Sequence, residues 1–378
     1  MLIDPKLVTD GLLALAVALI ISFLATPPVK AFAQKVGAID VPTEARRVHD
    51  HPIPRLGGLA IFLAFIMSVV IFADVNRQVQ GILLGAVVVV IVGVIDDIYP
   101  LPALLKFGMQ ILAALIAVYH GVVIQIISNP NIFSTAEFLP LGVLAIPITV
   151  LWIVGITNSV NLIDGLDGLA VGVSAIASLT MLVISLAVAD RNVIVILAAL
   201  AGACIGFMPY NLNPAKIFMG DTGALLLGYV LATVSIIGFF KFYAIISFAV
   251  PFLALGLPLF DTAFAFCRRI LHGQNPMSPD RGHFHHRLID MGLSQKQAVA
   301  ILYSISAVLG LSAVVITTSG EMKALILIIT FCVAMGIAAI VFKKGLVHEN
   351  KNGDKPSEKP DTAQKRPEDV STVDKKKD

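Results

Sequence analysis

Charged residues are scarce in this chain of 378 residues. Asp, Glu, Lys and Arg make up only 14% of it, whereas a soluble domain carries about 25%. Hydrophobic residues reach 57%, against about 45–50% in soluble domains, and mean hydropathy is +0.89. The shortage of charge excludes an ordinary water-soluble fold, and the sequence predicts a polytopic, all-α membrane protein.

Three further absences narrow the possibilities. Only three cysteines occur, an odd number that lies in or beside apolar runs, so neither a disulfide framework nor a zinc site is expected. No Gly-x-x-x-x-Gly-Lys motif is present, so any phosphate must be held by a metal ion and cationic side chains. The first residues lack a basic stretch and an A-x-A cleavage site, so the first apolar run is expected to remain as a span.

Long apolar runs are what the sequence has in abundance. A membrane-spanning helix needs about 20 residues, and the runs predict about eleven spans. The segment "GVVIQII", residues 121–127, is too short to cross and is expected to form an external hairpin or loop. The predicted spans are 10–27, 56–73, 79–95, 102–119, 139–157, 168–188, 193–210, 222–240, 243–260, 297–317 and 323–342.

Lysine and arginine are distributed unequally between the two sides that these spans define. Leaving out the C-terminal tail, twelve of them lie in or beside the connections that follow odd-numbered spans, and five lie on the other side. The positive-inside rule then predicts an outside N-terminus, a cytoplasmic C-terminus and a multi-pass protein of the cell membrane. Residues 348–378 are almost free of apolar side chains and are expected to form a disordered cytoplasmic tail after a membrane domain of residues 1–347.

Polar clusters also follow odd-numbered spans, and this clustering is the strongest functional signal. External connections offer little more than "ADRN" and "TSGEMK", whereas loops that were polar only for solubility would occur on both sides. The predicted site therefore faces the cytoplasm. The clusters are "EARRVHDHPIPRLGG", "GVIDDIYP", "NSVNLIDGLDG", "NPAKIFMGDTG" and "SPDRGHFHHRL".

Each cluster has a structural interpretation beside the functional one. Asp96 and Asp97 could be a solvated helix end, although a helix C-terminus disfavours negative charge. Asp221 could simply cap the eighth span. The histidines could be ordinary loop residues, a metal site or a cationic clamp, and the neighbouring Arg281 and Arg287 favour the clamp.

The stretch from Asn158 to Asp167 is the hardest to explain structurally. Four polar groups at steps of three residues would wrap half of a helix, so the fifth span is expected to end near Asn161 and then turn at its two Asp-Gly pairs. Amide and carboxylate oxygens that converge beside a membrane suit Mg²⁺, a hard cation.

Taken together, "DD" after an apolar run, "NxxNxxDGxDGL", "FMGDTG" and "DRGHFHHRL" resemble motifs of the polyprenyl-phosphate N-acetylhexosamine-1-phosphate transferases. Their order and separations also match, over about residues 27–288. The span count and the histidine-rich last loop look like the branch that uses UDP-N-acetylglucosamine. That branch initiates cell-envelope polymers such as teichoic acid linkage units or O-antigen.

The resemblance implies a role for each matching position. Asn161 and Asp221 match the Mg²⁺ positions, with Mn²⁺ as an alternative ion, and Asp96 and Asp97 match the pair beside the lipid phosphate. Substrate-binding positions, including the basic first loop as the weakest match, are Asn158, Asp164, Asp167, Phe218, His285, Arg46, Arg47 and His49. The catalytic clamp on the pyrophosphate and sugar matches His283, His286 and Arg281.

The implied reaction is attack of undecaprenyl phosphate on the β-phosphorus of UDP-N-acetylglucosamine, in one displacement or through an aspartyl-phosphate. Other UDP-N-acetylhexosamines and UDP-MurNAc-pentapeptide are the alternative substrates. Expected partners are membrane lipid and a second copy in a homodimer, with no nucleic acid. A secondary transporter is the alternative of another class. It is disfavoured because transporter sites lie near the bilayer midplane between two repeats, and no repeat is evident here.

Overall fold

The computed structural model describes residues 4–41, 51–128, 138–188, 190–239, 250–271 and 283–317. The expected eleventh span and the C-terminal tail lie outside these ranges. So do four of the predicted site residues, Arg46, Arg47, His49 and Arg281. The predictions for these parts of the chain stay predictions.

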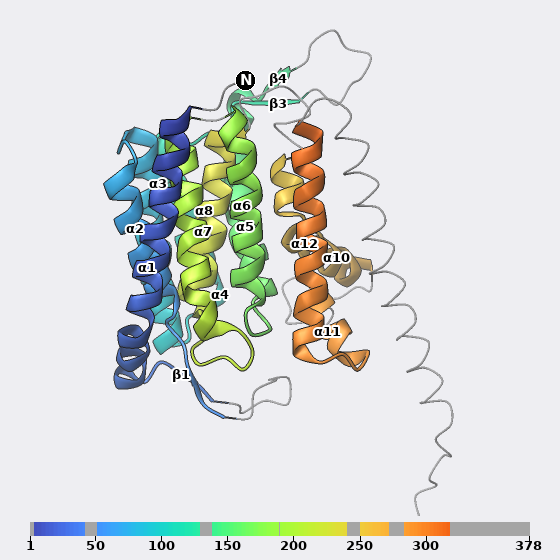
Figure 1. Ribbon diagram of the computed structural model, residues 1–378. Helices are drawn as coiled ribbons and strands as arrows, with labels where there is room; N and C mark the ends of the chain where they lie inside the picture. Colours follow the sequence, from blue (N-terminus) through green and yellow to red (C-terminus); the bar gives the residue numbers. More distant parts are fainter. Residues whose placement is uncertain are drawn as a thin grey trace, which may run out of the picture.

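The described chain is mostly helical, and its long helices run side by side as a bundle (Figure 1). Their order follows the apolar runs of the sequence. The helices are α1 (Pro5–Val36), α2 (Gly58–Phe72), α3 (Arg77–Ile98), α4 (Ala103–Tyr119), α5 (Ala145–Ile163), α6 (Leu169–Val188), α7 (Arg191–Asn211), α8 (Gly220–Phe239), α10 (Gly256–Leu271), α11 (Phe284–Asp290) and α12 (Gln295–Thr317). A 3-10 turn, Gly142–Leu144, precedes α5.

Seven of the described helices are long and apolar enough to cross a membrane, namely α1, α3, α5, α6, α7, α8 and α12. α2 and α4 are shorter apolar helices at the places of the second and fourth expected spans. The expected ninth span, 243–260, does not end where it was placed: the described chain turns at Leu255, and α10 continues to Leu271. A polytopic helical membrane protein is confirmed, while the count of eleven and the orientation of the ends stay predictions.

α1 is longer than the expected span 10–27, because it runs through Pro27 and Pro28 to Val36. Proline removes a helical hydrogen bond, yet this helix continues through both prolines. Before the prolines, α1 packs closely against α7. Side chains at Gly202 and Gly206 of α7 would meet carbonyl oxygens of α1 at 2.1 and 2.2 Å, so small residues let the two backbones touch.

Two short hairpins join the helices. β3 (Ile126–Ser128) pairs antiparallel with β4 (Phe138–Pro140), so the end of "GVVIQII", where a hairpin or a loop was expected, lies in a strand pair. β1 (Ile39–Asp40) pairs with β2 (Ile53–Pro54) at the other end of the bundle. The chain after β2 then binds the segment before α8, since the N–H of Phe218 donates to the Pro54 carbonyl at 2.8 Å. These bonds bring Arg55 beside the start of α8.

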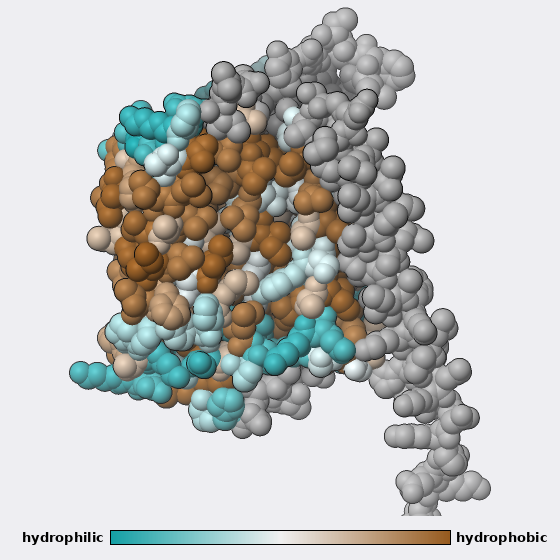
Figure 2. All heavy atoms as spheres, in the orientation of Figure 1, coloured by the Kyte–Doolittle hydropathy of each residue, from teal (hydrophilic) through white to brown (hydrophobic). Residues whose placement is uncertain are grey.

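On the face that Figure 2 shows, apolar side chains dominate the middle of the described molecule, and hydrophilic ones gather at both ends. Within this apolar middle α8 lies at the centre of the bundle, with its whole apolar stretch buried. Because α8 begins at Gly220, it carries Asp221 on its first turn. The core therefore holds this carboxylate at one end of the bundle.

Candidate active site

A cavity of about 420 Å³ opens at the end of the bundle where α3, α5 and α7 finish and α8 starts. Residues from five separate parts of the sequence meet at this end. Seven of the predicted site residues line the cavity together, which are Asp97, Asn161, Asp164, Asp167, Phe218, Asp221 and His286. The expectation that the polar clusters lie on one side is confirmed for the described clusters.

Asp97 explains why a carboxylate stands at the C-terminus of α3. Its Oδ1 accepts the N–H of Asp221 at 3.0 Å, and its Oδ2 accepts both the N–H and the hydroxyl of Thr222, at 3.1 and 2.6 Å. The side chain is thus placed at the N-terminus of α8, where the helix dipole favours negative charge. The cap of α8 comes from Asp97, and Asp221 is left to make other contacts.

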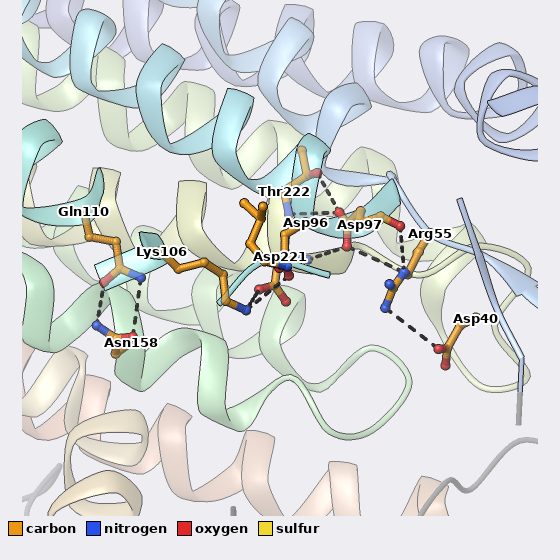
Figure 3. A network of polar contacts seen from close by, with 10 residues as sticks. Asp40, Arg55, Asp96, Asp97, Lys106, Gln110, Asn158, Asp221 and Thr222 are labelled. Carbon is orange, nitrogen blue, oxygen red and sulfur yellow. Dashed lines mark hydrogen bonds and ion pairs between the residues drawn. The ribbon is translucent and has the colours of Figure 1, made fainter. Parts of the chain in front are cut away.

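Lys106 of α4 reaches two of the aspartates, Asp96 and Asp221 (Figure 3). Its ammonium donates to Asp96 Oδ2 at 3.1 Å and to Asp221 Oδ2 at 2.9 Å. The sequence analysis counted this lysine only as a cytoplasmic charge. A lone cation at the start of an apolar run was the signal that could have identified it.

Arg55 is a second cation that the motifs did not single out. Its Nε donates to the Asp97 carbonyl at 3.1 Å and lies 3.8 Å from Asp97 Oδ1, and its guanidinium lies 3.8 Å from Asp40 (Figure 3). Arg55 and Asp40 both line the cavity. The chain after β2 therefore brings positive charge to the same carboxylate that caps α8.

Asn158 was expected to line the cavity, and the structure places it elsewhere. Its amide nitrogen donates to Gln110 Oε1 at 2.5 Å and to the Val154 carbonyl at 2.8 Å. Three residues along a helix rotate a side chain by about 60° from its neighbour, so Asn161 faces the cavity while Asn158 faces α4. Asp96, which bonds Lys106, also lies outside the cavity lining.

The loop between α5 and α6 forms the turn that the two Asp-Gly pairs predicted, because α5 ends at Ile163 and Asp164 is its C-cap. Burial, together with repulsion from Asp221, Asp97 and Asp167, raises the pKa of Asp164 to about 8. Asp167 instead has partners, since its Oδ2 accepts hydrogen bonds from Asn213 Nδ2 at 2.9 Å and from the Ala215 N–H at 3.0 Å. Carboxyl groups are thus crowded together on one wall of the cavity.

The three histidines divide into one cavity residue and two buried ones. His286 lines the cavity, whereas His283 and His285 are only 5% and 2% exposed and lie behind it. Burial and the neighbouring imidazoles lower the pKa of His285 to about 3, so this ring is neutral at physiological pH. Arg287 on the same helix lies over the Phe264 ring at 5.0 Å. Of the predicted clamp, only His286 reaches the cavity among the residues that the structure describes.

Asn211 and Gln295 also line the cavity, and the sequence analysis missed both. Asn211 ends α7 and donates to the Ile217 carbonyl at 3.0 Å, while Gln295 begins α12 and accepts a hydrogen bond from Asn213 at 2.6 Å. Asn211 stands two residues before Asn213 in "YNLNPA", a polar pair at a span end that could have been singled out. No comparable signal marks Gln295.

The cavity offers oxygen donors that could hold a hard cation. Asn161 and Asp221 face it together, with Asp164 nearby. In the part of the chain that the structure describes, no three Asp, Glu, His or Cys side chains cluster closely enough to form a protein-only metal cage. Mg²⁺ is commonly bound through one or two carboxylates and completed by water and substrate phosphates. The donor set therefore fits Mg²⁺ in the presence of a phosphorylated substrate.

Known proteins resemble this chain over most of its length. The profile of glycosyl transferase family 4 matches residues 79–239. A Bacillus subtilis protein, the probable undecaprenyl-phosphate N-acetylglucosaminyl 1-phosphate transferase, is 41% identical over 345 residues, which cover 90% of this chain and 95% of the relative. The decaprenyl-phosphate N-acetylglucosaminephosphotransferase of Mycobacterium tuberculosis is 35% identical over 76% of this chain and 77% of its own length.

A relative with another substrate in its name is more distant. The phospho-N-acetylmuramoyl-pentapeptide-transferase of Staphylococcus aureus is 31% identical over 68% of this chain and 83% of its own length. The 41% identity to the Bacillus subtilis protein extends over nearly the whole length of both chains, and the family profile matches as well. The chain therefore belongs to glycosyl transferase family 4.

Proposed function

We propose that this protein transfers N-acetylglucosamine 1-phosphate from UDP-N-acetylglucosamine to undecaprenyl phosphate. The products are UMP and a lipid-linked pyrophosphoryl sugar that initiates a cell-envelope polymer such as teichoic acid. The proposal rests mainly on a relative that is named for this transfer. It is 41% identical to this chain, in an alignment that covers 95% of the relative. A cavity that combines acidic, amide and cationic side chains at the end of an apolar bundle supports it.

Two groups of side chains suit the two substrates. The cavity, with Phe218 and Asp167 at its wall, can accept a water-soluble nucleotide. Asp96 and the hydrogen-bonded pair of Gln110 and Asn158 are polar side chains next to α4 that do not line that cavity, and they are taken here as the second group. Lys106 contacts both groups through Asp96 and Asp221. In the proposed reaction its ammonium lies where the lipid phosphate meets the diphosphate and neutralises their combined negative charge.

The proposed chemistry is a single displacement at the β-phosphorus. A lipid phosphate oxygen forms the new P–O bond, the bond to the bridging oxygen breaks, and that oxygen leaves with UMP. A phosphate monoester has a second pKa of about 6, so it is already largely dianionic at neutral pH and needs little help from a base. The three hydrogen bonds that Asp97 accepts support this route over an aspartyl-phosphate, because they occupy its carboxylate oxygens.

Asn161 and Asp221 are the residues that would hold Mg²⁺, or Mn²⁺ in its place. A bound ion would supply neutralising charge for the diphosphate and the departing UMP. His286 at the cavity, with Arg281 from the neighbouring segment, would contact the phosphoryl oxygens. The membrane setting fits this division, because the nucleotide arrives from the cytoplasm and the lipid phosphate along the bilayer.

The test measures UMP release by purified protein in detergent with undecaprenyl phosphate and Mg²⁺. We expect turnover with UDP-N-acetylglucosamine and little with UDP-N-acetylgalactosamine or UDP-MurNAc-pentapeptide. The pentapeptide substrate is included because a relative at 31% identity is named for it. Faster turnover of the pentapeptide would reassign the donor, and no UMP from any UDP-sugar would refute the transferase.

A further inference from the structure

Asp261 of α10 is a buried carboxylate that the proposed chemistry does not use. It is 1% exposed and does not line the cavity of about 420 Å³. We propose that Asp261 is a positioning residue, which sets His286 at the cavity by holding a stack of buried histidines. This inference rests on the proposed transferase function and adds a residue to it that no sequence motif indicated.

Both oxygens of the Asp261 carboxylate bind the start of α11. Oδ2 lies 2.9 Å from His283 Nδ1, and Oδ1 accepts the N–H of Phe284 at 2.8 Å. His283 is the N-cap residue of α11, but its own side chain makes no capping hydrogen bond. The carboxylate of Asp261 supplies that cap from another helix. It also accepts the Nδ1 proton of His283, which fixes the orientation of the imidazole ring.

The orientation of His283 passes to the cavity through ring contacts. The rings of His283 and His285 lie 5.8 Å apart and are nearly parallel, at 9°. His285 contacts His286 at 4.2 Å with an interplanar angle of 43°. His286 is the member of this stack that lines the cavity. A rotation of His283 would therefore displace His285 and change the direction in which His286 points.

The stack also rests on the loop between α5 and α6. A Cβ atom at Gly165 would lie 2.2 Å from Nε2 of His285, so the imidazole packs directly on a backbone without a side chain. Gly165 lines the cavity beside Asp164. The histidine stack therefore spans from α10 to the acidic cavity wall, and Asp261 stands at its outer end.

α11 has a second attachment to α10 that does not involve Asp261. The rings of Phe264 and Phe284 are stacked at 5.8 Å, and Arg287 lies over Phe264 at 5.0 Å. Loss of the Asp261 carboxylate should therefore leave α11 in place while the imidazoles lose their fixed orientation. This separation makes a positioning role testable in a folded protein.

The experiment compares Asp261→Asn with Asp290→Asn, a matched change at an exposed carboxylate of α11. An amide keeps the shape of Asp261 and can still accept from Phe284, but its NH₂ group would face His283 Nδ1. We expect Asp261→Asn to lower kcat by roughly 10–100-fold, the range known for carboxylates that orient metal-binding histidines. The KM for UDP-N-acetylglucosamine should change less than about threefold, and Asp290→Asn should match wild type.

A double-mutant cycle separates positioning from a general structural effect. In a His286→Ala background, adding Asp261→Asn should lower kcat less than about twofold further, because the ring that it positions is gone. Multiplicative losses, or a wild-type kcat for Asp261→Asn in a protein with unchanged thermal unfolding, would overturn the inference. Absence of UMP release in wild type and in Asp290→Asn would instead refute the proposed function.

Discussion

At the scale of single residues, the position of Asp221 shows how the fold separates two roles. A carboxylate in the first turn of a helix commonly caps that helix, but here Asp97 makes the cap and Asp221 bonds Lys106. The hydrogen bond from Lys106 thus holds Oδ2 of Asp221 toward α4. A residue that sequence reasoning could treat as a cap is therefore available for binding.

The assignment of Mg²⁺ can be tested at the same scale. Asp221→Asn and Asn161→Ala should each lower UMP release by more than about 100-fold at low Mg²⁺, because both remove an oxygen donor of the proposed site. Raising Mg²⁺ should restore part of the rate in the weaker variant. Elution from size-exclusion chromatography should match wild type. Normal turnover of either variant at low Mg²⁺ would place the ion elsewhere.

Asp164 makes the stability of the ion-free protein depend on pH. Its pKa of about 8 lies above the ordinary 3.8, so the folded state binds one more proton than the unfolded state between these two values. Its contribution to stability is therefore present below about pH 4 and is lost as the pH rises to about 8. Thermal unfolding in detergent with a chelator should show that wild type loses stability relative to Asp164→Asn between pH 6 and 8. Parallel curves for the two proteins would contradict the raised pKa.

At the scale of helices and loops, local signals in the sequence were sufficient for some features and not for others. The Asp-Gly pairs predicted the turn after α5, and "GVVIQII" predicted a hairpin or loop where β3 pairs with β4, because each signal lies within the element that it forms. The expected span 10–27 covers only part of α1, which continues to Val36.

For the site, local sequence signals predicted less than they did for the helices and loops. The motifs identified Asn161 and Asp221, but Lys106, Arg55 and Asp261 were missed. These three act through contacts with distant segments: Lys106 and Asp221 are 115 positions apart in the chain. Asn158 was expected at the cavity because the family resemblance implied it, whereas the neighbouring helix that receives its side chain was unknown.

The junction between α3 and α8 yields a prediction at this scale. Thr222→Val keeps the shape of the side chain but removes the hydroxyl that donates to Asp97 at 2.6 Å. Loss of one buried hydrogen bond to a charged group should cost about 1.5–3 kcal/mol, visible as a lower unfolding temperature in detergent. Turnover should fall as well, because Asp97 loses a partner.

A matched control lies on the same helix. Thr233→Val removes a buried hydroxyl that bonds only carbonyl groups of its own helix, at Tyr229 and Val230. This variant should keep wild-type turnover. If both variants behave alike, the contact between Asp97 and α8 has no special importance.

At the scale of the whole molecule, all described cavity residues gather at one end of an apolar bundle, and the opposite end is tied by other contacts. There Arg191 pairs with Asp10 at 2.8 Å and with Asp74 at 3.1 Å, which joins α7 to α1 and to the connection between α2 and α3. The molecule therefore separates a polar site from a structural polar cluster by the thickness of its apolar middle (Figure 2).

Labelling of single cysteines can test which end faces the cytoplasm. The native Cys204, Cys267 and Cys332 are first replaced by serine or alanine, since Cys267 is exposed. Val143→Cys, at a residue 92% exposed near the β3–β4 end, should react with an impermeant thiol reagent in intact cells. Lys216→Cys, exposed at the cavity end, should react only after the membrane is opened. The reverse pattern would invert the topology.

The complete burial of α8 has a consequence for the lipid environment. Bilayers of different thickness force exposed helices to tilt, or force the lipid to stretch, at a cost of fractions of a kcal/mol per Å. α8 contacts protein along its whole apolar stretch, so acyl chains do not act on it directly. Outer helices such as α1 absorb the mismatch, and the carboxylate at the start of α8 keeps its depth relative to its neighbours. The site is thereby insulated from changes in the acyl-chain length of the membrane in which it works.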